Sequence, residues 1–395
     1  MSDFIYVDHA ATTKVRPEVL EAMMPYLTEY YGNVSSMYSI SDITEQAVKD
    51  ARASIAAAIG AKEQEIIFTS CGSESNNMAL RGIMKKAGGG HIITTNVEHH
   101  AILHTVEALV KEGCTATYLP VDERGLITPD QLEAAITPET KIISIMMANN
   151  EIGTIEPIQE LAAVAKAHGI YFHTDAVQAV GHLPINVKEM GIDMLSASGH
   201  KFGAPKGIGF LYVRNGIYLP ALITGGGQER GKRAGTENTA FIVGMAKALE
   251  LAVSEMDKTN ARLLKMRERL IDGILESIPY CRLNGDRERR VAGNVNVSIE
   301  FIEGEALLLM LDMNGICASS GSACTTGSLD PSHVLLAIGL THEVAHGSLR
   351  ISLGEDNTQA DVDYILKTLP PIVKRLRDMS PVWEDAIKAG IAEDY

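Results

Sequence analysis

Residues 170–178 read IYFHTDAVQ, and this stretch decides the fold class. Its first five residues are rich in β-branched and aromatic side chains and predict a buried strand, which is followed by a polar turn at Asp175. In an open parallel sheet, the ligand site lies at the carboxyl ends of the strands, where the loops gather. We therefore expect an α/β protein with Asp175 at its site.

The same pattern recurs through the first two-thirds of the chain. Short β-rich runs that end in polar or glycine-bearing turns occur at residues 65–70, 91–95 and 141–147. Amphipathic stretches with helical spacing lie between them, for example at residues 131–136 and 158–168. Such alternation predicts a mostly parallel sheet that is covered by helices on both faces.

The last third of the chain has a different order of predicted helices and strands. One long helical pattern covers about residues 239–278. After it, residues 294–299 and 348–352 alternate like strands, and residues 305–313 and 358–377 have helical spacing. We therefore predict a second, smaller α+β domain.

Composition excludes several classes of protein. The 395 residues carry a formal net charge of −15, so the chain lacks the broad basic surface of a nucleic-acid-binding protein. The five cysteines are scattered and odd in number, which argues against a disulfide framework and favours a reducing compartment. The first residues lack a signal-peptide pattern, and no apolar run approaches the ~18 residues of a membrane helix. We expect a cytoplasmic protein with no direct nucleic-acid or membrane partner.

Residues 196–202, SASGHKF, contain a lysine that suits covalent chemistry. Small residues before Lys201 allow a bulky ring and a phosphate to approach, and Ser198 and His200 can donate to phosphate oxygens. Taken alone, such a lysine is more often a solvated loop residue. Asp175 could pair with a protonated pyridine nitrogen or cap the next helix, and Gln178 could reach a phenolic oxygen.

Residues 69–77, TSCGSESNN, run from a predicted strand through a glycine turn into a helix. Backbone N–H groups at a helix N-terminus, together with a hydroxyl, suit a phosphate group. The stretch lacks the GxxxxGK[ST] pattern of a nucleotide P-loop. It therefore indicates an anion site of another kind.

Nine motifs occur in a fixed order along nearly the whole chain. They are DHAATT (8–13), TSCGSESNN (69–77), VEHHA (97–101), NNEIGT (149–154), TDAVQ (174–178), SASGHKFGAPKGIGF (196–210), GGGQERGKRAGTEN (225–238), SSGSACTTG (319–327) and GSLRISLG (347–354). This set resembles the cysteine desulfurases of the NifS/IscS type, which are class V aminotransferase-like, fold type I pyridoxal-phosphate enzymes.

The resemblance implies a domain organisation. A large domain would hold a mostly parallel sheet of the seven-stranded type between helices, beside a smaller α+β domain. Residues 1–15 would belong to the small domain and the active-site wall, and residues 16–255 would form the large cofactor-binding domain. Residues 256–395 would form the small C-terminal domain with a catalytic-cysteine loop at about 319–330. The resemblance also implies a homodimer.

The resemblance assigns roles around pyridoxal 5'-phosphate. Lys201 would bind the cofactor covalently and then move protons, while His99 would stack on the pyridine ring. Asp175 would keep the ring nitrogen protonated, and Asn150 and Gln178 would contact the ring substituents.

The remaining roles concern the phosphate and the substrate. Thr236 would reach the phosphate of the neighbouring subunit, and Arg350, helped by Asn33, would fix the substrate carboxylate. A planar guanidinium suits that task because it makes two parallel hydrogen bonds. Within one subunit, four residues would bind the phosphate: Gly72, Ser73, Ser198 and His200.

Cys324 selects the reaction. It lies in a Ser/Gly/Thr-rich stretch typical of a loop, where a thiolate is accessible. The implied reaction converts L-cysteine to L-alanine and leaves a persulfide on Cys324, for delivery to iron–sulfur cluster assembly or tRNA thiolation through a scaffold protein or another sulfur acceptor. Two alternatives stay open, namely another lyase or aminotransferase of this fold, such as a selenocysteine lyase, and a catalytically silent assembly scaffold.

We predict no resident metal, although Cys324 would transiently meet a nascent iron–sulfur cluster on a partner. Zinc at His99, His100 and His104 is the weaker alternative, because adjacent residues of a helix face different directions.

The chain departs from the family pattern at four positions near the N-terminal wall of the expected site. Val34 and Tyr38 replace a usual proline and histidine, and His9 and Cys71 stand where the family commonly has asparagine and glycine. Val34 removes a rigid backbone constraint, so the positioning of Asn33 stays open.

Overall fold

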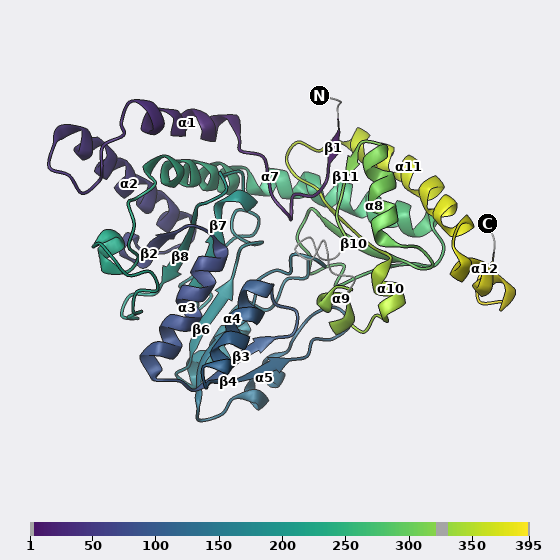
Figure 1. The fold of residues 1–395 in the computed structure, drawn as a ribbon, viewed down its shortest axis with the longest axis horizontal. Helices are drawn as coiled ribbons and strands as arrows, with labels where there is room; N and C mark the ends of the chain where they lie inside the picture. Colours follow the sequence, from purple (N-terminus) through teal and green to yellow (C-terminus); the bar gives the residue numbers. More distant parts are fainter. Residues whose placement is uncertain (1–3, 321–330, 394–395) are drawn as a thin grey trace.

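The computed structural model describes residues 4–320 and 331–393, which form a larger and a smaller part, each built on its own sheet (Figure 1). The large sheet has the spatial order β2-β8-β7-β6-β5-β3-β4. Its strands are β2 (Ile66–Thr69), β3 (His91–Thr95), β4 (Thr115–Leu119), β5 (Thr140–Ser144), β6 (Tyr171–Asp175), β7 (Met194–Ser198) and β8 (Gly209–Val213). Only β8 runs antiparallel to its neighbours, which confirms the predicted mostly parallel sheet.

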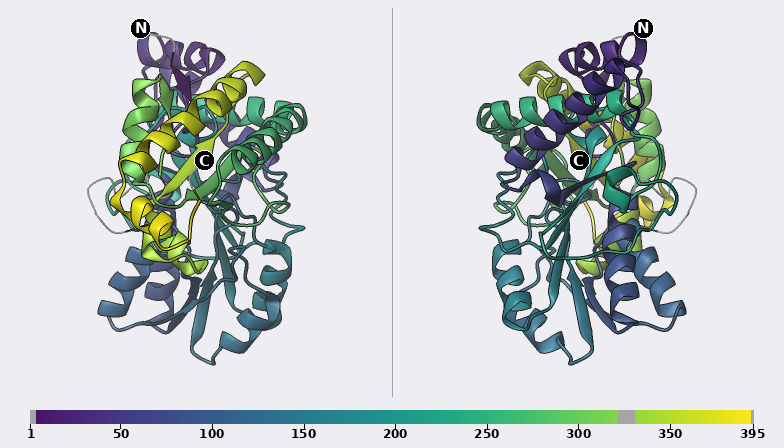
Figure 2. Two further views of the ribbon diagram at one scale, coloured as in Figure 1. Left: turned by 90° about the vertical axis from the view of Figure 1, so that its right-hand side faces the viewer. Right: turned by 90° about the vertical axis from the view of Figure 1, so that its left-hand side faces the viewer.

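Helices cover both faces of this sheet (Figure 2). On β2, Ile67 faces the apolar cluster under α3 and α4, while Ile66 and Phe68 face the larger cluster on the other side. The alternation follows from the two-residue period of a strand, and both faces are apolar because both are covered. The helices of this part are α1 (Pro17–Thr28), α2 (Ser39–Ala58), α3 (Gly72–Ala87), α4 (His100–Lys111), α5 (Pro129–Ala135) and α6 (Ile158–Ala167).

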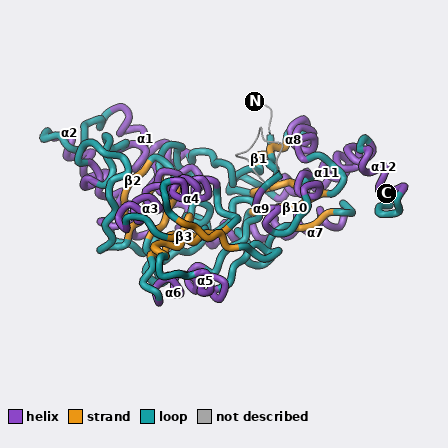
Figure 3. Tube along the Cα trace, turned by 60° about the horizontal axis from the view of Figure 1, so that its bottom comes forward, coloured by secondary structure: helices purple, strands orange, loops and turns teal. Residues whose placement is uncertain are grey.

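The smaller part contains the antiparallel sheet β12-β10-β9 and the short parallel pair β1-β11. Its strands are β1 (Ile5–Tyr6), β9 (Cys281–Leu283), β10 (Asn294–Ile299), β11 (Ile316–Cys317) and β12 (Ser348–Ser352). Its helices are α8 (Gly304–Met313), α9 (His333–Ala337), α10 (His342–His346), α11 (Gln359–Asp378) and α12 (Pro381–Lys388). Helix α12 lies at the opposite end of the molecule from α1 and α2 (Figure 3).

Helix α7 (Thr239–Ser277) runs through both parts as one continuous helix. Its first half contributes residues up to Ala252 to the core of the large part, and its second half contributes residues from Leu263 onward to the core of the small part. The expected boundary between residues 255 and 256 falls within this helix, between the two cores. Because one continuous helix packs in both cores, it fixes the position of the small part relative to the large part.

The N-terminal segment also connects the two parts. Val7 packs in the core of the small part, and the Ser352 amide donates to the Val7 carbonyl at 2.7 Å. A few residues later, the Thr13 amide donates to the carbonyl of His200 at 2.9 Å. The segment between these points is thereby held against the loop that contains Lys201.

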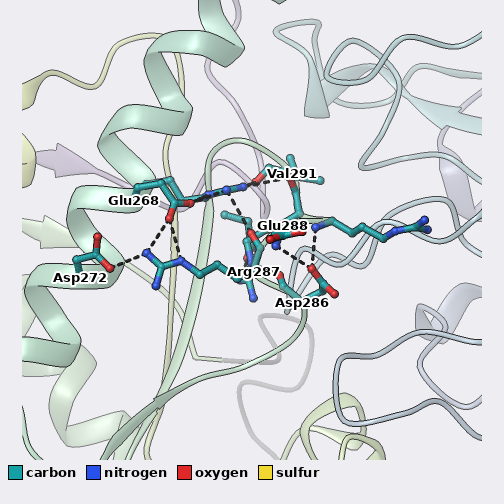
Figure 4. Close-up of polar contacts among 10 residues, drawn as sticks. Glu268, Asp272, Asp286, Arg287, Glu288 and Val291 are labelled. Carbon is teal, nitrogen blue, oxygen red and sulfur yellow. Dashed lines mark hydrogen bonds and ion pairs between the residues drawn. The ribbon is translucent and has the colours of Figure 1, made fainter.

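A polar joint attaches residues 284–291 to α7 (Figure 4). The Arg287 guanidinium donates to Glu268 at 2.9 Å and to Asp272 at 2.5 Å, and the Asp286 carboxylate accepts from two backbone amides at 2.7 Å. The same segment then meets the turn after β5, because the Val291 amide donates to the Gly153 carbonyl at 3.0 Å. This turn contains predicted site residues, so the joint helps to position the site.

Most predicted elements lie within one to three residues of their observed bounds, and one strand is shorter than expected. The run at residues 141–147 ends as the strand β5 at Ser144. Ile145 and Met147 still donate to the carbonyls of His173 and Asp175, so the backbone follows β6 without the regular ladder. Within residues 4–320 and 331–393, no helix combines the length and apolar character needed to cross a membrane.

Replacing Leu270 with alanine tests the second half of α7. Leu270 is fully buried in the small core, so Leu270→Ala should lower the free energy of unfolding by about 2–5 kcal/mol. On the same helix Leu264 is 43% exposed, and Leu264→Ala should change the free energy of unfolding by less than about 1 kcal/mol. Denaturant unfolding of the two variants measures the difference. Equal losses of stability would contradict the packing of Leu270 in the core of the small part.

Candidate active site

A cavity of about 300 Å³ lies at the carboxyl ends of β6 and β7 and is bounded by both parts of the molecule. Its volume falls at the lower end of the range of small-molecule sites. Ten of the predicted site residues line it: Gly72, Ser73, His99, Asn150, Asp175, Gln178, Ser198, His200, Lys201 and Arg350. Residues from six separate motifs therefore meet at one place.

Asp175 is the last residue of β6 and is 5% exposed. One carboxylate oxygen accepts from the Asn76 side-chain amide at 2.7 Å, and the other accepts from the Val177 backbone amide at 3.0 Å. The expected helix after Asp175 is absent, because the following residues form turns, so the carboxylate caps a turn instead. Sequence reasoning missed Asn76, although it lies within the quoted stretch TSCGSESNN.

Gly72 and Ser73 begin α3 and present the first turn of this helix to the cavity. The first N–H groups of a helix have no intrahelical partner and attract anions. A Cβ atom on Gly72 would lie 2.6 Å from a Val177 methyl group, so only glycine fits there without displacement. The glycine thus allows the helix N-terminus to approach the cavity closely.

His200 lies beside this anion site, and its Nδ1 atom is 3.1 Å from the Thr12 hydroxyl. Burial, together with the neighbouring charges of Lys201 and Lys206, lowers the pKa of His200 to about 4. The imidazole is therefore neutral at physiological pH and acts through hydrogen bonds rather than charge. Ser198, at the end of β7, is 3% exposed and adds a hydroxyl to the same wall.

Lys201 is held by the N-terminal segment. Its Nζ atom donates to the carbonyls of Ala10 and Ala11 at 2.5 and 2.8 Å, and the Gln178 side-chain amide donates to the same Ala10 carbonyl at 3.0 Å. The DHAATT motif thus contributes backbone acceptors, a role that its side chains do not reveal. Gln178, predicted to reach a ring substituent, lines the cavity while it makes this contact.

His99 caps α4, because its Nδ1 atom accepts from the Ala101 amide at 3.0 Å. Since Nδ1 is an acceptor, the proton of the neutral ring lies on Nε2. The ring centroids of His100 and His104 are stacked 4.9 Å apart, whereas the ring centroids of His99 and His100 are 6.4 Å apart. Over residues 4–320 and 331–393, no group of three potential ligands is arranged to bind a metal ion.

Arg350 occupies the small-domain side of the cavity and is 1% exposed. Its Nη2 atom forms an ion pair with Asp8 at 2.8 Å, and Nη1 donates to the Asn150 carbonyl at 2.9 Å. The Nε atom is buried without a hydrogen-bond partner among the residues that the structure describes. An unused donor on a fixed guanidinium suits a carboxylate ligand.

Three predicted residues are not brought into the cavity by the described chain. Asn33 lies in the exposed segment between α1 and α2, where its side chain accepts from the Ser35 amide at 2.9 Å. Thr236 is exposed just before α7, which is compatible with the role assigned to it in a neighbouring subunit. Cys324 lies outside the described residues.

The chain matches the model of the family "Aminotransferase class-V" over residues 5–365. This chain belongs to the class V aminotransferase family. Relatives of this class V chain include the protein named Cysteine desulfurase IscS of Clostridium botulinum strain Hall, which is 58% identical over 98% of this chain and 99% of the relative. The protein of the same name from Methanosarcina thermophila is 55% identical over 96% of this chain and 94% of the relative.

Solved structures agree with this class V assignment. A "NIFS-LIKE PROTEIN" superimposes with a TM-score of 0.89 at 36% identity, covering 95% of this chain and all of that chain. The structure titled "SspA in complex with cysteine" has a TM-score of 0.79 at 40% identity and covers 88% of this chain and 98% of that chain. The predicted resemblance to enzymes of the NifS/IscS type is thereby confirmed.

The cavity of this class V chain fits pyridoxal phosphate. Asp175 offers a carboxylate fixed at two points, the start of α3 offers backbone N–H groups, and Lys201 offers an amine in the same wall. When bound, this cofactor withdraws the electron pair left at the substrate α-carbon after deprotonation. Asp175 would hold the ring of this cofactor, and the start of α3 would hold its phosphate.

Replacing Asp175 with asparagine tests the ring-nitrogen contact. Asp175→Asn should weaken pyridoxal-phosphate binding about 10- to 100-fold, because a charge-assisted hydrogen bond is replaced by a neutral one. Asp193 precedes β7 at the opposite end of the sheet, so Asp193→Asn should leave cofactor affinity unchanged. Titration of the apoprotein, followed by visible absorbance, measures both values. Unchanged affinity in Asp175→Asn would exclude the contact.

Proposed function

We propose that this chain is a cysteine desulfurase, which converts L-cysteine to L-alanine and keeps the sulfur atom on Cys324. The observation that carries the proposal is the meeting of Lys201, Asp175 and Arg350 in one cavity. The relatives named above support the choice of reaction, as does the neighbour whose title includes cysteine.

Each described residue then has a defined task. Arg350 binds the carboxylate of L-cysteine through its Nε atom, which has no partner among the described residues, and its two other nitrogens fix the orientation of the guanidinium. The Lys201 amine removes the α-proton and later returns protons to the product. His99, with its proton on Nε2, would stack on the cofactor ring and could donate to a reacting group. Asn150 and Gln178 would contact the ring substituents.

The sulfur-transfer step balances without an external oxidant. The Cys324 thiolate attacks the substrate sulfur, so an S–S bond forms while the C–S bond breaks, and the electron pair of that bond stays with the substrate. The β-carbon takes a proton and leaves within L-alanine. Cysteine and enzyme thiol thus become alanine and enzyme persulfide.

The flanks of the Cys324 segment lie beside the cavity. The backbone of Ser319 exchanges two hydrogen bonds with that of Arg350, at 2.7 and 3.2 Å. Five residues of chain span at most about 18 Å, which sets the upper limit on the distance between Cys324 and this attachment point. On the other flank, Ser332 contacts Glu151, which lines the same cavity.

We also propose that the enzyme works in the cytoplasm as a homodimer and passes its sulfur to an iron–sulfur scaffold protein or another acceptor, in cluster assembly or tRNA thiolation. Thr236 would complete the phosphate site of the second subunit. Large exposed apolar side chains on and after α1 support association with a second copy: Leu20, Leu27, Tyr31 and Met37.

Replacing Cys324 with serine separates this function from its alternatives. With L-cysteine, the wild-type chain should produce alanine and protein-bound cyanolysable sulfur, and Cys324→Ser should lose both while its cofactor absorbance is retained. Burial raises the pKa of Cys281 to about 12, so Cys281→Ser should behave like the wild type.

The other outcomes identify the rival functions. Alanine formation that survives in Cys324→Ser would favour another lyase of this fold, such as one acting on selenocysteine. A chain that cannot be reconstituted with pyridoxal phosphate would favour the silent scaffold.

A further inference from the structure

Glu151 is a buried carboxyl group in the cavity wall that the proposed reaction does not use. It follows Asn150 in the turn after β5 and is 3% exposed. A carboxyl group is seldom fully buried unless its oxygens have defined partners. Its contacts therefore indicate what it does.

The partner of Glu151 is Ser332, the residue that caps α9. The Ser332 hydroxyl oxygen accepts from the amides of Val334 and Leu335 at 3.1 and 3.2 Å. Both of its acceptor positions are thus occupied, and its proton is left to donate to the Glu151 Oε2 atom. Glu151 must therefore act as the acceptor of this hydrogen bond.

The backbone of Glu151 is fixed independently by the small domain. The side-chain amides of Asn294 and Asn296, on β10, donate to the Glu151 carbonyl at 3.0 and 3.1 Å. A Cβ atom on Gly153 would lie 2.5 Å from Asn294, so the turn and the strand are in close contact. The carboxyl group consequently offers Ser332 an acceptor at a defined position.

The residue after Ser332 makes a second attachment. The Nε2 atom of His333 contacts the Glu98 carbonyl at 3.0 Å, and its ring lies 4.7 Å from that of His100. Val334 and Leu335 then pack in an apolar cluster with Ile152. The first turn of α9 is thus held against strand ends of the large part.

The charges that face Glu151 come from several elements. Burial raises the pKa of Glu151 to about 7, while the Ser332 hydrogen bond, Arg350 from β12 and His99 before α4 oppose this effect. The carboxyl group therefore changes its charge near neutral pH. The ionised form accepts the Ser332 hydrogen bond more strongly than the protonated form does.

We propose that Glu151 is a positioning residue for sulfur transfer, which acts through Ser332 to hold the start of α9 at the cavity wall. This proposal rests on the proposed function, because Ser332 follows the segment that contains Cys324. Glu151 touches neither the reacting sulfur nor the α-carbon in this role. It fixes the described end of the chain from which the nucleophile is delivered.

The test compares Glu151→Gln, whose amide oxygen can still accept from Ser332, with Glu151→Ala, which cannot. In Glu151→Ala, kcat for alanine formation should fall about 10- to 100-fold, while bound cofactor and KM for L-cysteine change little. Glu151→Gln should retain most of the rate. Glu156 is a buried carboxyl group outside the cavity, with a pKa raised to about 8, so Glu156→Gln serves as the matched control and should keep the wild-type rate.

The pH profile distinguishes positioning from a purely structural role. Above pH 7 the wild-type carboxylate is ionised, and the ratio of wild-type to Glu151→Gln kcat should exceed one. As the pH falls through about 7, the wild-type group becomes neutral like the amide, and the ratio should approach one. A ratio that does not vary with pH would overturn the proposal.

Hydrogen exchange provides a readout that needs no activity. In Glu151→Ala, the Val334 and Leu335 amides should exchange about 10- to 100-fold faster than in the wild type, and in Glu151→Gln they should not. Ser332→Asp keeps a cap but cannot donate, so it should reproduce Glu151→Ala, whereas Ser332→Thr should not. Faster exchange in Glu151→Ala, together with a wild-type chain that makes no alanine, would refute the desulfurase function but not the contact between Glu151 and Ser332. Unchanged exchange and kcat in Glu151→Ala would refute the role of Glu151.

Discussion

The ion pair between the buried Arg350 and the partly exposed Asp8 is the contact on which the rest of the site depends. Arg350 is on β12 of the small part, and Asp8 is on the N-terminal segment that continues to the Lys201 loop. The same guanidinium donates to the carbonyl of Asn150, in the turn after β5. Removing Asp8 would leave the Arg350 charge buried without its ion-pair partner, which is strongly destabilising. One side chain thus joins three distant segments around the cavity.

This arrangement explains why the site lies between two parts of the molecule. The sheet alone supplies Asp175, Ser198 and the start of α3, which can hold a ring and a phosphate. On the other side of the cavity, β12 of the small part contributes Arg350. Helix α7 and the joint around Arg287 fix the position of the two parts relative to each other, so the two halves of the site face each other.

Sequence reasoning predicted the fold class and most elements because the strands are short, β-branched and bounded by turns. It placed the end of β5 too late, since residues after Ser144 continue beside β6 without a regular ladder. It expected a helix after Asp175, where the structure has turns capped by that carboxylate. The first error concerns a boundary, which is set by hydrogen bonds to a neighbouring strand, and the second arises because Asp175 accepts from the Val177 amide within a turn.

The sequence by itself determined the fold class and the acidic character, and the family resemblance of its motifs pointed to ten of the residues that line the cavity. Only the tertiary structure decided how these residues are held. Asn76 supports Asp175, backbone carbonyls of Ala10 and Ala11 hold Lys201, and Glu151 binds Ser332. These contacts join residues about 100 to 190 positions apart, and no periodicity or local pattern encodes such pairings. They exist because the folded sheet and β12 bring loop ends together at one edge.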